Sequence, residues 1–133
     1  MKTTEYRFGG KTIHLYLNGQ AMFDLDRLDE DRPEGTPEIL HLARENNRDG
    51  FFALCQVAAI LARQGENCRR YLRYESARVP EAEELLLLLT PMQMVGLRTA
   101  VFQSIHAGYT APSADDGGDI DTGLAELEKK TGL

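Results

Sequence analysis

Four acidic residues near the end of the sequence have a spacing close to that of a calcium-binding loop. They stand at the first, fifth, seventh and twelfth positions of such a loop and are Asp115, Asp119, Asp121 and Glu126. The third position is Gly117, which has no side-chain oxygen, and the sixth is Ile120, where the loop needs glycine. The pattern therefore favours an acidic, solvated linker over a calcium site.

The histidines and cysteines also lack the spacing of a metal or catalytic site. The histidines are scattered along the chain, outside any HExxH or paired-ligand spacing, and are His14, His41 and His106. Cys55 and Cys68 form no CxxC pair, and we interpret both as buried free thiols. No GxSxG, P-loop or GxGxxG motif occurs in the sequence. We therefore predict a protein that is not an enzyme and uses no cofactor or metal.

One cluster of basic residues has two interpretations. Its members are Arg69, Arg70 and Arg73, with Arg78 a few residues further on. Their spacing favours a solvated helix face that pairs with Glu66 and Glu75. The functional interpretation is a docking patch for an acidic segment of another protein. The glutamates of 81–84 are explained by the positive amino end of a helix rather than by paired catalytic carboxylates.

The signals that point to binding are mainly apolar. The leucines of 85–89 form a run longer than one helix face can bury, and Met92 and Met94 follow. Surfaces rich in methionine and leucine adapt to apolar helices of partner proteins, although the same residues would also complete a core. The candidate partner-binding residues are Leu85, Leu86, Leu88, Leu89, Met92, Met94, Arg69, Arg70, Arg73, Leu124 and Leu127.

Composition and charge narrow the class of protein. A chain of 133 residues is expected to be one domain, since domains usually have about 100–200 residues. The net charge of −6 disfavours nucleic acid as a partner, because binding to phosphates requires a basic surface. The amino terminus lacks the apolar core of a signal peptide, and no segment reaches the ~20 apolar residues that span a bilayer. We therefore expect a cytoplasmic protein that does not contact membranes.

Two segments must organise the fold. Residues 51–62 have Gln56 as their only polar member, so they predict a helix that is apolar all round and must be surrounded by the rest of the chain. Gly65 is expected to end this helix. Upstream, two alternating segments flank Gly9 and Gly10 and predict a β-hairpin with a primed turn. Counting outward from the turn pairs Tyr6 with Ile13.

We predict an α+β fold, mostly α, in which the N-terminal hairpin packs on a bundle of about five helices. The globular domain would cover residues 1–108, with the hairpin at 3–17 and helices at about 18–28, 36–46, 49–64, 66–77, 80–89 and 91–107. Residues 109–133 are rich in glycine and aspartate, and we expect a flexible acidic tail with a short helix at 120–130.

With these segments in order, the chain resembles the tail assembly chaperones of long-tailed bacteriophages and prophages of Gram-positive bacteria. The resemblance rests on FGGKTIHL at 8–15, NGQAMF at 18–23, GFFALC at 50–55, AILARQG at 59–65, LTP at 89–91 and DIDTGLAEL at 119–127. It implies a non-enzymatic protein of the bacterial host cytoplasm that binds and shields the tape-measure protein, with the tail-tube protein as a further candidate partner. It implies no catalytic residues.

Other functions fit the same composition. A head–tail connector or a tail terminator would need a ring-forming surface, whereas we expect a monomer or a weak oligomer. A small helical regulatory adaptor would bind a different protein. The family resemblance also implies that a longer form is made by ribosomal frameshifting, for which the codons of Lys129 and Lys130 are candidates.

Overall fold

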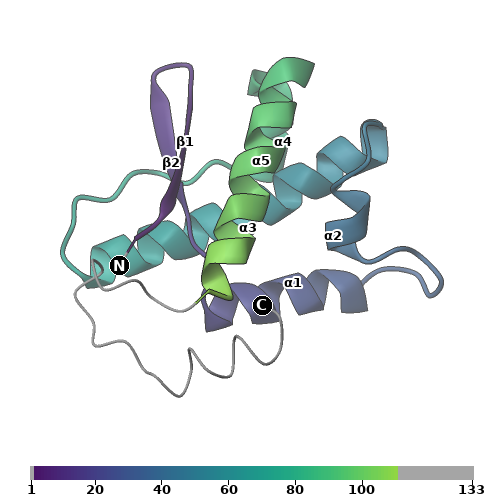
Figure 1. Cartoon of the computed structure of the whole chain (residues 1–133), viewed down its shortest axis with the longest axis horizontal. Coiled ribbons are helices and arrows are strands. Elements are labelled where there is room, and N and C mark those ends of the chain that lie inside the picture. The colour runs from purple at the N-terminus through teal and green to yellow at the C-terminus, as the bar shows by residue number, and fades with distance from the viewer. Residues whose placement is uncertain (1, 111–133) are drawn as a thin grey trace.

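The computed structural model describes residues 2–110 and contains a two-stranded hairpin and five helices. In chain order these are β1 (Thr4–Phe8), β2 (Lys11–Leu15), α1 (Gly19–Glu30), α2 (Ile39–Leu42), α3 (Arg48–Tyr71), α4 (Ala82–Leu88) and α5 (Pro91–Gly108). The hairpin lies beside the helices, and α3 runs through the middle of the molecule (Figure 1). The predicted α+β, mostly α class is therefore confirmed. The predicted helix at 120–130 lies outside the described residues.

The hairpin has the predicted turn and register. Gly9 and Gly10 have φ values of +51° and +75°, which a primed turn requires and glycine adopts without strain. Tyr6 pairs with Ile13 as expected. On the same face Phe8, Ile13 and Leu15 are buried, so alternation along each strand did identify the face that meets the helices.

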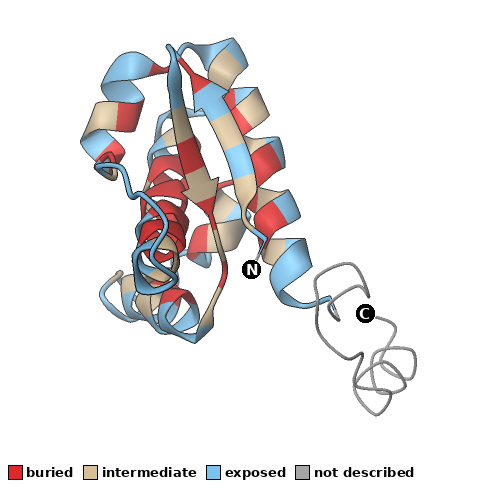
Figure 2. Cartoon of the chain, turned by 90° about the vertical axis from the view of Figure 1, so that its left-hand side faces the viewer, coloured by how far each residue is buried: buried red, intermediate tan, exposed pale blue. Residues whose placement is uncertain are grey.

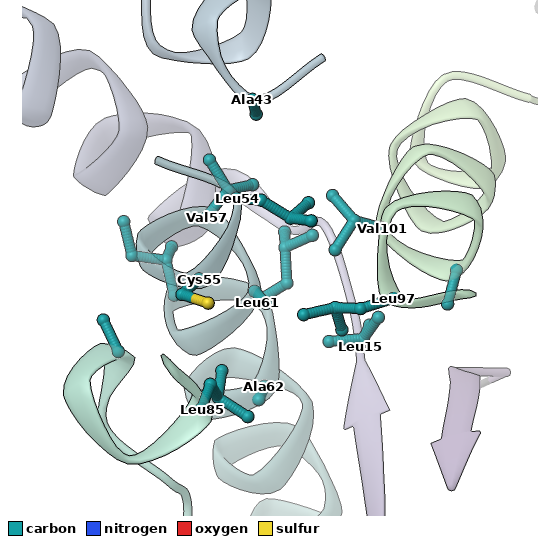
Figure 3. Close-up of a cluster of buried hydrophobic side chains, with 14 of the residues drawn as sticks. Leu15, Ala43, Leu54, Cys55, Val57, Leu61, Ala62, Leu85, Leu97 and Val101 are labelled. Carbon is teal, nitrogen blue, oxygen red and sulfur yellow. The ribbon is translucent and has the colours of Figure 1, made fainter. Parts of the chain in front are cut away.

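Helix α3 is the core helix that the apolar segment predicted. It contacts α1, α2, α4, α5 and β2. Figure 3 shows Leu54, Val57 and Leu61 of this helix directed toward side chains of β2 and α5. In Figure 2 the buried residues concentrate on this helix and on the sides of the other elements that face it. Within the predicted apolar segment 51–62, Phe51 is half-buried and Phe52 is exposed, and the first buried residue is Ala53.

The prediction that Gly65 ends the core helix was wrong, and so was a separate helix at 66–77. Helix α3 is continuous from Arg48 to Tyr71. A Cβ atom at position 65 would overlap the backbone carbonyl of His14 in β2. Next to this contact, the Tyr16 amide donates a hydrogen bond of 3.2 Å to the Leu61 carbonyl. The glycine is therefore required by the close approach of β2 rather than by a helix end.

Helix α3 ends in a capping geometry that usually contains a glycine, but here it contains an arginine. The Tyr74 amide donates to the Arg69 carbonyl at 2.8 Å and the Arg73 amide to the Arg70 carbonyl at 3.0 Å, the two bonds of a Schellman motif. Arg73 occupies the left-handed position with φ +66°, where glycine is usual. Residues 72–77 are therefore not helical, and the carboxylate of Glu66 accepts the Ala77 amide at 3.0 Å from this returning chain.

Helix α2 is shorter than the predicted 36–46. Its first amide, that of Ile39, donates to the carboxylate of Asp29 at 2.7 Å. Thr36, the first residue of the predicted helix, instead donates its hydroxyl to the Pro33 carbonyl at 2.7 Å. The cap is thus supplied from the end of α1, ten residues upstream, and no local pattern indicates it.

Caps at the other helices follow the sequence. Asn18 accepts the Ala21 amide at 2.8 Å and begins α1. Thr90 and Gln93 form the reciprocal capping box that begins α5, with Pro91 in the first turn. Each of these signals acts within three residues, which explains why α1 and α5 begin where the sequence predicts.

Candidate functional site

The leucine run of 85–89 is divided between the core and the solvent. The side chains of Leu85 in helix α4 and of Leu89, the residue that follows this helix, are buried in the core. The three leucines between them cannot all face the core with Leu85, because successive helical residues are 100° apart. Leu86, Leu87 and Leu88 are exposed, and Leu87 most of all at 83%.

Helix α5 continues this apolar exposure. Met92, in its first turn, is 81% exposed, and Val95 lies one turn further on and is also exposed. Met94 and Leu97 point the other way and are buried in the core. We use the name α4–α5 apolar surface for the exposed apolar residues of these two consecutive helices, which do not pack on each other: Leu86, Leu87, Leu88, Met92 and Val95.

The helices that carry this surface are held in place by caps and an ion pair. Glu81 and Glu84 form a capping box at the start of α4, and the Arg78 guanidinium also donates to both carboxylate oxygens of Glu84. This ion pair lowers the pKa of Glu84 to about 2. The glutamates of 81–84 thus act at a helix start, as the sequence indicated. Arg78 is engaged here and does not extend the basic cluster.

The structure corrects the predicted partner-binding residues. Leu85, Leu89 and Met94 are buried in the core and offer no surface to a partner. Of the predicted leucines and methionines, Leu86, Leu88 and Met92 remain exposed. Leu124 and Leu127 lie outside the described residues. Sequence reasoning missed Leu87 and Val95, although placing Leu85 and Leu89 on the core face would have exposed Leu87.

The predicted basic cluster is at the end of α3. Arg69 lies 3.6 Å from Glu66, donates to the Glu75 carbonyl at 2.8 Å and covers the ring of Tyr74. Arg70 donates to Asn67 and Ser76. These partners are not members of the α4–α5 apolar surface, so the structure does not join the two predicted parts of the site into one.

A groove beside this cluster was not predicted from the sequence. It has a volume of about 340 Å³ and is lined by Tyr16, Asn67, Cys68, Tyr71 and Leu72. Tyr71 is 86% exposed, a large exposure for an aromatic side chain. We call this depression the Tyr71 groove. It was missed because Tyr16 comes from the chain after β2, which only the tertiary structure brings to the end of α3.

The two cysteines differ in environment. Cys55 is buried as predicted, its thiol 3.8 Å from the Met94 sulfur, and desolvation raises its pKa to about 12. Cys68 is only half-buried, contrary to the prediction, and its sulfur accepts a bond of 3.5 Å from the Asn18 amide nitrogen. Cys55 is therefore held as a protonated thiol, whereas Cys68 borders the Tyr71 groove.

Over residues 2–110, no group of three or more potential metal-ligating side chains comes together.

A depression of about 330 Å³ between α1, α3 and α4 carries charges of both signs around Phe52 and Gln56. Within the described part of the chain, none of the helices combines the length and apolar character needed to cross a membrane.

Comparisons with known proteins identified no relative of this chain. No protein-family model matches the chain, and neither a curated protein nor a solved structure does so.

Proposed function

We propose that this protein is a non-enzymatic tail assembly chaperone, which binds the tape-measure protein of a phage tail and shields its apolar helical faces. The observation that carries the proposal is the α4–α5 apolar surface, whose five side chains lie within residues 86–95. Several large apolar side chains exposed within ten residues of the chain favour a binding site for another protein. The sequence resemblance to tail assembly chaperones supplies the class of partner.

The composition of the surface suits a helical partner. Leucine and methionine side chains change rotamer readily and adapt to the ridges of an apolar helix. A tape-measure protein is a long chain with apolar helical faces that would aggregate until tube subunits cover them. A small acidic protein, here with a net charge of −6, adds charge and solubility to such a complex.

The size of the surface favours an affinity low enough for later release. Full burial of a leucine or methionine contributes about 1.5–3 kcal/mol, whereas association costs about 4–15 kcal/mol in lost freedom. A few such side chains therefore give weak binding at one site, which repetition along a filament strengthens. Because the capping boxes at Glu81 and Thr90 hold both helices in place, little further ordering is needed.

Co-expression with the cognate tape-measure protein tests the proposal. The native chain is expected to keep the tape-measure protein in the soluble fraction, and Leu87→Asp with Met92→Asp should abolish this. Both side chains are exposed, so the double variant should fold, which thermal unfolding will check. The control is Phe23→Asp, which places a charge on an apolar side chain of α1 that is 67% exposed. A tape-measure protein that stays soluble with the double variant would contradict the proposed surface.

A further inference from the structure

The Tyr71 groove combines an apolar floor with a basic rim. Tyr71 and Leu72 are exposed on one side of it, and Tyr16 closes the other. Arg70 donates to Asn67 of the groove, and Arg73 follows Leu72 in the chain; both arginines are exposed and make no ion pair with any described residue. An occupant that fits this groove would therefore carry apolar side chains for the floor and carboxylates for the arginines.

The end of α5 lies against the chain segment that borders this groove. Helix α5 ends at Gly108, where an added Cβ would lie 2.8 Å from a methyl carbon of Leu17. Leu17 adjoins Tyr16, which lines the groove, and Asn18, which contacts Cys68 of the groove at 3.5 Å.

The sequence after Thr110 has the chemistry that the groove requires. Its acidic residues, against two lysines, are Asp115, Asp116, Asp119, Asp121, Glu126 and Glu128. Ile120, Leu124 and Leu127 have the i, i+4, i+7 spacing that places apolar side chains on one helix face. Residues 111–119 can span up to ~30 Å at about 3.3 Å per residue.

We propose that segment 120–128 of this chain docks in the Tyr71 groove of the same molecule, with Leu124 and Leu127 on the apolar floor and its carboxylates facing Arg70 and Arg73. The docking concerns a surface separate from the α4–α5 apolar surface, so it does not depend on the proposed function. Docking within one molecule is favoured because a short connection gives the segment a high effective concentration at the groove.

Cys68 provides a reporter within the native chain. A docked segment covers this half-exposed thiol, so its alkylation by N-ethylmaleimide should be slow in the full-length protein. Leu124→Asp with Leu127→Asp should release the segment and accelerate alkylation of Cys68 by at least about fivefold, because the apolar contact is lost. Cys55 is buried and its pKa is raised to about 12, so it should stay unlabelled while the core is intact.

The matched control places the same two charges on the opposite side of the segment. Thr122→Asp with Ala125→Asp leaves the leucines in place and should leave the alkylation rate of Cys68 unchanged. The rate should also be independent of protein concentration, as expected for docking within one molecule. Equal labelling of the native chain and the Leu124/Leu127 variant would overturn the proposal. Protection that appears only at high protein concentration would also overturn it, since the occupant would then belong to a second copy.

Discussion

Gly65 of α3 lies directly against the backbone carbonyl of His14 in β2, with no space for a side chain between them. One helical turn earlier, the Leu61 carbonyl accepts the Tyr16 amide at 3.2 Å. These two contacts fix the hairpin on the central helix, because the backbone of one element touches the backbone of the other. They also bring Tyr16 to the end of α3, where it lines the Tyr71 groove.

Gly65→Ala should therefore destabilise the fold. The added methyl group would push β2 away from α3, and overpacking of this kind typically costs about 1–3 kcal/mol in the free energy of unfolding. Gly19→Ala is the control, since its Cβ would meet no atom within 4 Å. Urea unfolding of both variants measures the difference. A Gly65→Ala protein as stable as the native one would mean that the close approach to His14 is not needed.

A pair of leucines tests which residues form the core. Leu61 in α3 is fully buried, whereas Leu87 in α4 is largely exposed. Leu61→Ala is expected to lower the free energy of unfolding by about 2–5 kcal/mol, because it leaves a cavity. Leu87→Ala should change it by less than about 0.5 kcal/mol. If the loss at Leu61 in chemical denaturation were below about 1 kcal/mol, α3 would not be the central helix.

Glycine substitutions at two arginines near the end of α3 should change the stability of the protein in opposite directions. Arg73 has a φ of +66°, a conformation that costs an L-residue about 1–2 kcal/mol and glycine little. Arg73→Gly is thus expected to stabilise the protein, after subtraction of the larger entropy of glycine in the unfolded chain. Arg70→Gly lies inside the helix and should destabilise by about 1 kcal/mol. Melting temperatures of the two variants that shift in the same direction would argue against the Schellman ending.

The ion pair between Arg78 and Glu84 predicts a dependence of stability on acid. The pKa of Glu84 is about 2 in the folded protein against 4.5 as its ordinary value. Between these two values the unfolded chain binds more protons, so this contribution to stability is complete above pH 4.5 and is lost as the pH falls toward 2. Glu84→Gln should remove that contribution and flatten the decline of unfolding free energy in this range. The control is Glu83→Gln, since Glu83 makes no ion pair with the described residues; a native decline no steeper than that of Glu84→Gln would contradict the effect.

The sequence alone was sufficient for the elements whose signals are local. The hairpin turn at Gly9 and Gly10, its register and its buried face follow from alternation on either side of two glycines. The caps of α1 and α5 at Asn18 and Thr90 act on amides only three residues away. Twelve nearly continuous apolar positions at 51–62 likewise indicated the helix that the others surround.

Tertiary structure decided the features that depend on partners distant in the chain. Gly65 reads as a helix end until His14, on another element, is seen against it. The cap of α2 comes from Asp29, and which leucines of 85–89 are buried depends on the side from which α4 meets α3. The candidate surfaces also depended on distant partners. Leu85, Leu89 and Met94 were predicted to bind a partner but are buried in the core, and the Tyr71 groove was not predicted. The physical reason is that the hydrogen bonds and periodicity within a helix act over about four residues, whereas exposure is set by whichever distant element covers a side chain.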